Sequence, residues 1–538
     1  MEGFLIERET TNHQYQREAK MFEPYKHSGM IDFSDPDNVQ KMQEALEKVR
    51  SQFGQTYDLI IGGDRVQSDD TFDSINPSHK DQCVGTFQVA KPEHIDQAIE
   101  AGYEAFETWK EYSPEARASI FKRAAALMQE RRFELVAWQI LEEGKNWPET
   151  DAEVAEAIDF NNYYPKEALR YYQQRDVDQW WKRENNEYFY QPIGVGAVIP
   201  PWNFPLAIMS GMSSAAMVTG NPIILKPSSD APAMAYQYVK ILEEVGLPDG
   251  VLNFITGGGG KIGDKLVGHP RTRFIVFTGS KEVGLHINEL AAKMQPGQQF
   301  IKRVSAEMGG KDAMIVLEDA SDMDAAADAA VKGAFGYQGQ KCSACSRLIV
   351  EESIHDELLN KIIEKARQIS VGPVEKQENW MGPVINAGAE EKILEYIEIG
   401  KEEGELVLGG KKVSDEGYYI EPTIFDQISP GDRLEQEEIF GPVLSVVTAE
   451  NYDEALEIAN NTEYGLTGGV WTRDQARIDR AKREFHVGNL YFNRSITGSI
   501  VGTQPFGGFK LSGTNHKAGG PDYLRFFLRA KSVSQYLR

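Results

Sequence analysis

Two of the three cysteines in this chain of 538 residues lie three positions apart, at Cys342 and Cys345. The surrounding stretch, GQKCSACSRLIV over residues 339–350, allows three interpretations. The thiols could form a redox or metal-binding pair, they could be a nucleophile and a bystander, or they could be two small apolar side chains in a core. Each interpretation needs different companions in the sequence.

The sequence around Cys342 favours the interpretation that this residue is a catalytic nucleophile. A structural zinc site needs about four ligands, and the sequence provides no second C-x-x-C and no nearby histidine pair. A thioredoxin-like pair opens a helix after a strand, whereas this pair precedes the strand pattern RLIV. GQKC places the cysteine in a loop bounded by glycine, where function often resides. Two buried structural thiols remain the alternative, and we predict no metal site.

Other common catalytic signatures are missing from the sequence. No two of the nine histidines lie four apart, no Gly-Lys pair is followed by Ser or Thr, and no G-x-S-x-G occurs. A formal G-x-G-x-x-G spans residues 258–263, but it lies in a glycine run that matches this spacing easily. It is therefore weak support for a dinucleotide fingerprint.

Charge and cysteine content narrow the class of protein. The 57 basic and 82 acidic residues give a formal net charge of −25, which argues against nucleic acids and anionic membranes as partners. An odd number of only three cysteines fits a reducing compartment, and no secretory signal is readable, so we expect a cytoplasmic protein. Residues 188–225 carry no charge, yet their prolines predict buried strands and a core helix rather than a membrane span.

The elements that position these residues follow a strand–helix alternation. A helix is predicted over residues 39–53, short strands over 58–66 and 83–90, and long helices over 92–172. Farther along, apolar strands rich in β-branched residues alternate with helices, in two runs that divide near residues 298–311. This pattern predicts two α/β domains with parallel sheets and a crevice between them.

Six short motifs occur in an order that is typical of one enzyme family. They are IPPWNFP at residues 199–205, LKPSSD at 225–230, FTGSKEVG at 277–284, AEMGGKD at 306–312, GQKC at 339–342 and EEIFGPV at 437–443. Together they resemble the aldehyde dehydrogenase family, and the resemblance extends from about residue 58 to the C-terminus. By this resemblance the chain is identified as a member of that family.

The resemblance implies a catalytic group of three residues. Cys342 would add to an aldehyde as a thiolate, a strong nucleophile, and form a thiohemiacetal and then a thioester. The Asn203 amide and the Cys342 N–H would stabilise the oxyanion, and Glu307 would activate the water that hydrolyses the thioester. Cys345 has no role in this scheme and is interpreted as packing.

The resemblance also implies NAD as the cofactor. The residues expected to bind it are Pro201, Trp202, Lys226, Ser229, Gly279, Ser280, Glu438 and Phe440. Lys226 would bind a ribose, and Ser280 would bind phosphate at the start of a helix. Strongly NAD-selective relatives are expected to carry glutamate where this chain has Ser229, so we expect NADP to be tolerated. The glycine run at residues 257–260 is then interpreted as a loop.

Four further motifs point to one branch of this family. They are FEPYKH at residues 22–27, QGQKCSACSR at 338–347, TGSIVGTQPFGGFKLSGTN at 497–515 and GGPDYLRFF at 519–527. They resemble the bacterial enzymes that oxidise L-glutamate γ-semialdehyde, formed when 1-pyrroline-5-carboxylate opens by hydrolysis. The implied product is L-glutamate, in the second step of proline catabolism. A dehydrogenase of another semialdehyde is the nearer alternative, and a non-catalytic structural or binding descendant is the farther one.

The same branch implies a substrate site. It consists of Ser343, Gly498 and Ser499 for the α-carboxylate, Phe204 and Phe506 for the aliphatic chain, and Glu156 for the amino group. Alanine is expected at the position of Ser499, so a hydroxyl in a tight pocket could shift specificity. For Glu156, the face of a solvated helix is the alternative.

The predicted fold class is an aldehyde dehydrogenase-like α/β fold, with two parallel-sheet domains and a small β oligomerisation element. Residues 1–173 and 193–307 are assigned to an NAD-binding domain, and residues 308–510 to a catalytic domain. Residues 174–192 and 511–538 are assigned to oligomerisation strands that pair across subunits. We therefore expect a homodimer or higher homo-oligomer that acts on a small molecule, without nucleic-acid or membrane partners.

Overall fold

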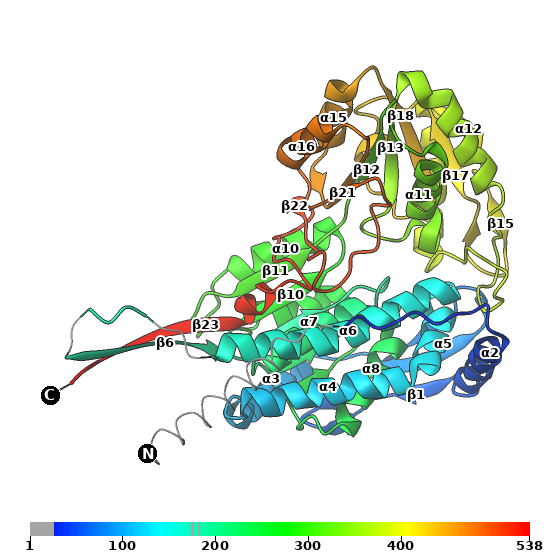
Figure 1. Ribbon diagram of the computed structural model, residues 1–538. Coiled ribbons are helices and arrows are strands. Elements are labelled where there is room, and N and C mark those ends of the chain that lie inside the picture. Colours follow the sequence, from blue (N-terminus) through cyan, green and yellow to red (C-terminus); the bar gives the residue numbers. More distant parts are fainter. Residues whose placement is uncertain (1–25, 174–176, 181–182, 538) are drawn as a thin grey trace, which may run out of the picture.

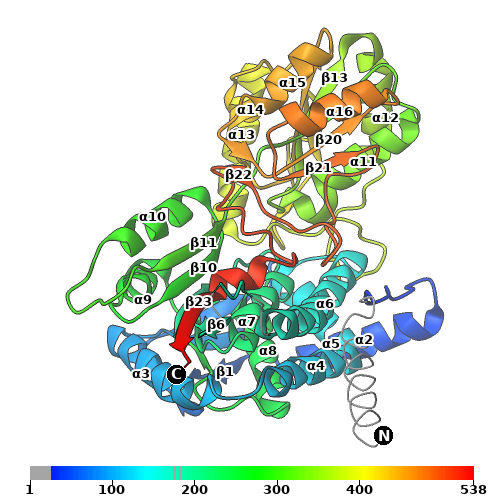
Figure 2. The same cartoon turned by 60° about the vertical axis from the view of Figure 1, so that its left-hand side comes forward.

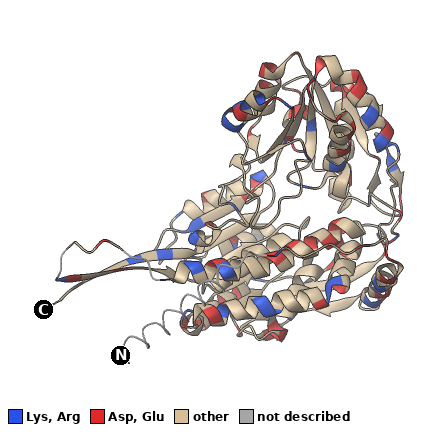
Figure 3. Ribbon diagram, in the orientation of Figure 1, with Lys and Arg blue, Asp and Glu red and all other residues tan. Residues whose placement is uncertain are grey.

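The computed structural model describes residues 26–173, 177–180 and 183–537, which form two lobes (Figure 1). Each lobe is built on one seven-stranded sheet. Charged residues lie mainly on the outer helices of both lobes, while the strands of the sheets carry few (Figure 3). Apolar strands are therefore buried beneath charged helices, as expected for parallel sheets covered on both faces.

The first sheet has the strand order β11-β10-β7-β8-β9-β2-β3. Its strands are β2 (Leu59–Ile61), β3 (Asp64–Val66), β7 (Gly196–Ile199), β8 (Ile223–Leu225), β9 (Leu252–Phe254), β10 (Phe274–Thr278) and β11 (Arg303–Glu307). The strands from β7 to β11 run parallel, whereas β2 pairs antiparallel with β9 and β3. The carboxyl ends of the parallel strands therefore meet at one edge.

Helices surround this sheet. They are α2 (Pro36–Arg50), α3 (Pro92–Trp109), α4 (Pro114–Glu130), α5 (Arg132–Glu143), α6 (Trp147–Tyr172), α7 (Ala207–Val218), α8 (Pro232–Glu244), α9 (Asp264–Gly268) and α10 (Lys281–Ala292). Helix α7 is buried almost throughout because it carries no charge. The uncharged residues 188–225 thus form strands and a core helix, as predicted. No helix in the described ranges has the length and apolarity that a membrane crossing requires.

The second sheet has the strand order β14-β17-β18-β13-β12-β20-β21. Its strands are β12 (Asp312–Val316), β13 (Cys345–Glu351), β14 (Glu405–Leu408), β17 (Thr423–Asp426), β18 (Val443–Ala449), β20 (Thr467–Trp471) and β21 (Asn489–Phe492). Its helices are α11 (Met323–Phe335), α12 (His355–Ala366), α13 (Ala387–Glu403), α14 (Arg433–Gln436), α15 (Tyr452–Asn460) and α16 (Gln475–Glu484). Only the edge strand β14 pairs antiparallel in the described sheet. Two α/β units with parallel sheets are confirmed.

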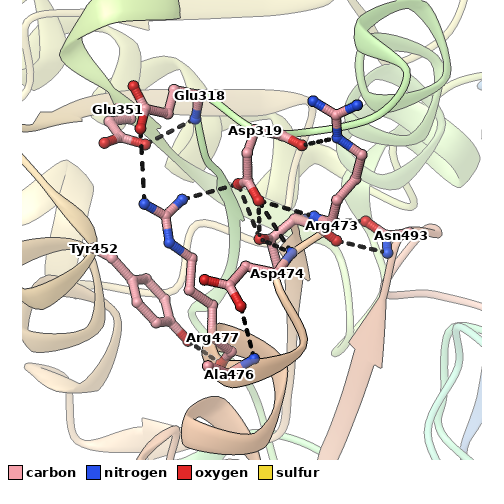
Figure 4. Close-up of polar contacts among 10 residues, drawn as sticks. Glu318, Asp319, Glu351, Tyr452, Arg473, Asp474, Ala476, Arg477 and Asn493 are labelled. Atoms are coloured by element: carbon pink, nitrogen blue, oxygen red, sulfur yellow. Dashed lines mark hydrogen bonds and ion pairs between the residues drawn. The ribbon is translucent and has the colours of Figure 1, made fainter.

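A polar cluster closes the end of this sheet that lies away from the predicted nucleophile. Asp319 follows β12 and accepts hydrogen bonds from the Thr472 hydroxyl and from the N–H groups of Arg473 and Asp474, which follow β20 (Figure 4). Arg477 Nη1 donates to the same carboxylate at 2.9 Å. Partial burial alone would raise the pKa of Asp319, but these donors together lower it. The carboxylate joins two neighbouring strand ends and leaves the opposite end of the sheet for chemistry.

Four smaller sheets complete the fold. Their strands are β1 (Gln55–Tyr57), β4 (Thr71–Ile75) and β5 (Cys83–Gln88), β15 (Lys412–Ser414) with β16 (Tyr419–Ile420), β19 (Tyr464–Gly465) with β22 (Phe509–Lys510), and β6 (Glu184–Pro192) with β23 (Leu528–Tyr536). Strands β6 and β23 leave the lobes as a narrow arm (Figure 1). This arm is the part of the fold that the sequence assigned to oligomerisation.

The two arm strands pair with each other within one chain. They run antiparallel, from Leu528 opposite Pro192 to Tyr536 opposite Glu184. The sequence predicted strands in both segments, but it paired them across subunits, and that pairing stays a prediction. Residues 174–176, 181–182 and 538 of the predicted segments lie outside the described residues.

Two local predictions differ from the structure. The oligomerisation segment was predicted from residue 511, but residues 511–527 pass between the lobes (Figure 2). Leu524 and Phe527 are fully buried in the core of the first lobe, because this apolar stretch buries more area there than on a two-stranded arm. The glycine run was predicted to be a loop, but Gly259–Gly263 forms a π-helical turn that leads into α9.

Candidate active site

Cys342 follows a rigid turn at the start of β13. A short 3-10 helix, Gly336–Gly339, holds Tyr337 at φ 48° and Gln338 at φ 57°, in the left-handed region that side chains rarely adopt. Gln338 Nε2 donates to two backbone carbonyls at 3.0 and 2.7 Å. A side chain at Gly339 would place its Cβ 2.2 Å from a backbone oxygen, so glycine is required there. Strained backbone held by such contacts is typical of functional sites.

The surroundings of Cys342 favour its neutral thiol. The side chain is only partly exposed. Burial raises the pKa of the thiol, and the carboxyl groups of Asp312, Glu438 and Glu307 raise it further. Nucleophilic attack therefore requires that the proton leave for a base, or that positive charge be brought near the sulfur. Cys345, by contrast, is fully buried in the core beneath the sheet, which confirms its interpretation as packing.

Asn203 precedes α7 and contacts the turn that carries the nucleophile. Its Nδ2 donates to Gln340 O at 2.9 Å, two residues before Cys342. The Asn203 backbone O accepts from Lys145 Nζ at 2.8 Å. Lys145 also pairs with buried Glu153, whose Oε1 accepts two backbone N–H bonds at the start of α7. The amide is thus fixed from both sides, as a preorganised oxyanion donor must be.

Glu307 ends β11, the edge strand of the first sheet that faces the second lobe. Its Oε2 accepts from Gly508 N at 3.2 Å, while Oε1 is buried and has no partner within the described chain. Burial raises the pKa of Glu307 to about 8, against the opposing effects of the Gly508 N–H and the Lys517 charge. A carboxyl group that titrates near neutral pH suits a general base.

Several of the predicted cofactor residues directly follow the carboxyl ends of parallel strands in the first sheet, which is where α/β sheets bind ligands. Lys226 follows β8 and is 5% exposed, and the one acceptor that the described residues offer its Nζ is Pro227 O at 3.2 Å. Burial lowers the pKa of Lys226 to about 8. An ammonium group with two unused hydrogens fits the hydroxyls of a ribose. Ser229 lies partly exposed in the loop beyond it.

The strand β10 leads to the predicted phosphate loop. Ser280 is the N-cap of α10, and its Oγ accepts from Val283 N at 3.3 Å. Gly279 N donates to Glu307 O at 3.1 Å, so the phosphate loop and the proposed base share a hydrogen bond. An exposed helix start of this kind fits a phosphate group.

Glu438 and Phe440 follow α14 in the second lobe and line a small pocket there together with Gly310 and Gly339. Glu438 Oε1 accepts from Gly310 N at 3.0 Å, and a Cβ at Gly309 would lie 2.2 Å from the carboxylate. Phe440, at φ 61°, makes an edge contact with Trp202 at 5.5 Å between ring centroids, next to partly buried Pro201. These contacts form a cradle that glycine alone can provide, which fits the close approach of a dinucleotide.

The predicted substrate loop offers unpaired backbone donors. Gly498, at φ 78°, and Ser499 follow β21, and neither N–H has a protein acceptor among the described residues. The Ser499 hydroxyl is hydrogen-bonded to Tyr491 OH at 2.6 Å, so it is turned toward the strand. The hydroxyl of Ser499 therefore has its hydrogen-bond partner within the protein.

The remaining substrate residues lie on three elements. Ser343 adjoins the nucleophile and is partly exposed. The ring of Phe204 lies against Tyr337, with centroids 6.3 Å apart, and Phe506 N donates to Ala518 O at 2.8 Å. Glu156 lies on α6, where burial and two neighbouring carboxylates raise its pKa to about 8. This environment differs from a solvated helix face.

A model of the aldehyde dehydrogenase family matches residues 65–533 of this chain. The chain belongs to the aldehyde dehydrogenase family. It is similar to 1-pyrroline-5-carboxylate dehydrogenase of Geobacillus thermodenitrificans, with 53% identity over 515 residues that cover 96% of this chain and all of the relative. Among solved structures it is similar to 1-pyrroline-5-carboxylate dehydrogenase from Thermus with bound NAD, with 50% identity, a TM-score of 0.94, and coverage of 96% and 99%.

A more distant structure marks how far the fold extends in the family. Betaine aldehyde dehydrogenase from Staphylococcus aureus, in complex with NAD+, is 30% identical to this chain, with a TM-score of 0.86 and coverage of 92% and 97%. The fold class predicted from the motifs is thereby confirmed. The roles of the individual residues remain those that the family resemblance implies.

Residues that the sequence did not single out support the site of this family member. Lys145 and Glu153 hold the loop of Asn203, Tyr491 takes the Ser499 hydroxyl, and Lys517 lies beside Glu307. Lys145, Glu153 and Lys517 act on partners more than 50 residues away in the sequence, whereas Tyr491 acts on a residue eight positions away. No local pattern distinguishes these residues from surface charges or a core tyrosine. Lys517 lies between two quoted motifs, at residues 497–515 and 519–527, and belongs to neither of them.

Proposed function

We propose that this chain oxidises L-glutamate γ-semialdehyde to L-glutamate with NAD, as the second step of proline catabolism. The observation that carries the proposal is that the N–H groups of Gly498 and Ser499, on the loop that follows β21, have no protein acceptor within residues 26–173, 177–180 and 183–537. Two adjacent backbone donors suit a carboxylate, because charge-assisted hydrogen bonds are about twice as strong as neutral ones. Identity of about half of all residues to enzymes named for 1-pyrroline-5-carboxylate supports the same substrate.

Carbon–sulfur bond formation comes first in the proposed mechanism. Cys342 loses its proton and adds to the aldehyde carbon, which gives a thiohemiacetal and places negative charge on the former carbonyl oxygen. The Asn203 amide, fixed against Gln340 O, and the Cys342 N–H stabilise this charge. Such donors contribute about 3 kcal/mol each in comparable sites.

NAD, when bound, supplies the acceptor for the hydride that leaves the thiohemiacetal carbon. We propose that Lys226 and Glu438 hold its two riboses and that Ser280 holds phosphate, with Gly279, Pro201, Trp202 and Phe440 lining the path. Lys226 has two hydrogens left for hydroxyl groups, and Gly309 and Gly310 leave the cradle of Glu438 free of side chains. The oxidised carbon is then a thioester on Cys342.

Hydrolysis of that thioester falls to Glu307. Its carboxylate takes a proton from water, the oxygen of this water attacks the thioester carbon, and the sulfur leaves as the Cys342 thiolate. One oxygen of Glu307 is held by Gly508 N, and the other is free of protein partners in the described chain. The free oxygen is the one that can take the proton.

The substrate assignment predicts strong discrimination. Aldehydes that lack the α-carboxylate, such as acetaldehyde and hexanal, should lose about 100-fold or more in kcat/KM, because remote binding orients the reacting carbonyl. Steady-state reduction of NAD across an aldehyde panel measures this. Ser343→Ala should narrow the gap by harming the native substrate most. Equal efficiency with hexanal would rule out the assignment, and better turnover of another semialdehyde would select the alternative.

The choice between NAD and NADP is proposed to depend on Ser229. Serine has no charge that repels a 2′-phosphate, so NADP should be tolerated, and Ser229→Glu should raise the NAD preference about tenfold through like-charge repulsion. The ratio of kcat/KM values for the two cofactors measures this, with Ser228→Glu as the matched control one position away. Complete rejection of NADP by the unaltered protein would show that another residue sets the preference.

The arm supports a proposal about assembly. Most side chains of β23 are exposed, including Tyr536 at 56%, and an isolated two-stranded sheet is marginally stable in water. We propose that a second copy of the chain covers the arm in a homodimer or higher homo-oligomer. A cytoplasmic location is proposed as well, supported by three cysteines that are all free.

A further inference from the structure

The segment between β21 and β23 encloses the end of β11 that carries Glu307. Thr514 N donates to Ala306 O at 2.8 Å, and Met308 N donates to Ser512 O at 2.8 Å. A bridge also joins Glu307 to Gly513, and a Cβ at Gly513 would lie 2.8 Å from the carboxylate. The wall around Glu307 is therefore made by backbone that must itself be held in place.

Lys517 holds this wall together. Its Nζ donates to Gly488 O at 2.6 Å, to Gly507 O at 2.7 Å and to Asn489 Oδ1 at 3.0 Å. All three ammonium hydrogens are thus used. Two of these bonds fix residues just before β21 and at its start, and the third fixes the peptide group whose N–H, on Gly508, binds Glu307 Oε2. The position of that N–H depends directly on Lys517.

Asn489 reinforces the same arrangement. Its Oδ1 also accepts from Gly507 N at 3.2 Å, and its Nδ2 donates to Pro505 O at 3.0 Å. Lys517 itself is at φ 42° and Asn515 is at φ 57°. A left-handed backbone conformation is unfavourable for residues other than glycine. The contacts of the ammonium group offset this strain, which is concentrated next to the proposed base.

The charge of Lys517 acts on the carboxylate as well. It opposes the effect of burial on the pKa of Glu307, and Glu307 in turn raises the pKa of Lys517 against burial. The negative charge of Glu307 also raises the pKa of Cys342 and the pKa of Tyr523. His516, on the same segment, is hydrogen-bonded to Thr514 Oγ1 at 2.8 Å. Lys517 is thus the ammonium group that favours an ionised Glu307.

We propose that Lys517 is a positioning residue for Glu307, which fixes the Gly508 N–H and supplies the positive charge that keeps the carboxylate available as a base. This inference rests on the proposed role of Glu307 in thioester hydrolysis. It assigns no contact between Lys517 and the substrate. Its effect should therefore fall on deacylation and leave acylation unchanged.

The test compares K517M with K510M as a matched control. Lys510 lies in the same segment, has φ 50°, and donates to two backbone carbonyls, Asn460 O at 2.6 Å and Thr462 O at 2.9 Å, which belong to a different part of the second lobe. Rapid mixing separates the burst of NADH from the slower steady state. K517M should keep the burst rate within about twofold and slow deacylation about tenfold, with the pH midpoint of deacylation about one unit higher. K510M should match the unaltered protein.

Additional variants keep the inference testable if K517M does not fold. K517R keeps the charge but cannot reproduce three ammonium bonds, so deacylation should slow while its pH midpoint stays unchanged. Equal slowing of burst and deacylation, or an unmoved midpoint in K517M, would overturn the inference. E307Q is measured alongside. If E307Q deacylates normally, the role of Glu307 fails as well, whereas a slow E307Q with a normal K517M contradicts the role of Lys517 alone.

Discussion

Cys342→Ala is expected to abolish aldehyde oxidation while leaving the fold and NAD binding intact. In the part of the chain that the structure describes, the thiol has no side-chain hydrogen bond to lose, and the turn that carries it is held by Gln338. Loss of a nucleophile costs on the order of 10⁴-fold or more in kcat, because every later step needs the covalent intermediate. The rate of semialdehyde oxidation tests the loss of activity. Quenching of the protein's fluorescence on addition of NAD tests whether cofactor binding is kept.

Cys345→Ala is the matched control for this prediction. The same atom is removed three residues away, from a site that is fully buried in the core. Its cost should be about 1 kcal/mol of stability from lost packing, with kcat nearly unchanged. If the alanine variant at 345 were inactive and the one at 342 active, the assignment of the nucleophile would be reversed.

Much of this architecture could be predicted from the sequence because its signals are local. Buried parallel strands are continuous apolar runs, and GQKC or PPWNFP marks a loop by its glycine or prolines. The same logic explains the failure at residues 511–527. An apolar stretch near a chain end fits an arm as well as a core, and the choice depends on area buried against residues such as Phe274, far away in the sequence.

The buried charges of the site could not be predicted for a related reason. Lys145 and Glu153 are both almost fully buried, yet in the sequence each is an ordinary charged residue of a helical segment. Their burial is tolerable because they pair with each other, and because Asn203 O and the start of α7 take their remaining hydrogen-bonding groups. Such compensation is visible only when the tertiary contacts are known.

Acylation and deacylation require different ionised groups, the Cys342 thiolate for the first step and the Glu307 carboxylate for the second. Burial raises the pKa values of both Cys342 and Glu307, so the neutral forms of thiol and carboxyl are favoured together. The nucleophile needs to lose its proton before acylation, whereas the carboxylate has to be ionised for deacylation. Because Glu307 raises the pKa of the thiol, ionising both at once is unfavourable. The two steps are therefore expected to respond to pH with different midpoints.

Glu307→Gln is expected to slow deacylation by about 10²–10⁴-fold, since an amide cannot take a proton from water. Its amide oxygen can still accept from the Gly508 N–H, so the fold should persist and the acylation burst of NADH should remain, followed by very slow turnover. In the unaltered protein the base is the ionised form. With a pKa of about 8, the ionised fraction rises with pH, so deacylation should increase from pH 6 with a midpoint near 8 and level off above about pH 9.

The glutamine variant should lose that pH dependence, because its side chain does not titrate. Rapid mixing at several pH values tests both expectations in one experiment, and Glu282→Gln, on an exposed turn of α10, is the matched control. A normal steady-state rate in Glu307→Gln would remove this residue from the mechanism. If the variant were slow but kept the midpoint near pH 8, that titration would belong to another group. Lys226 would then be the first residue to replace, because burial lowers its pKa to about 8.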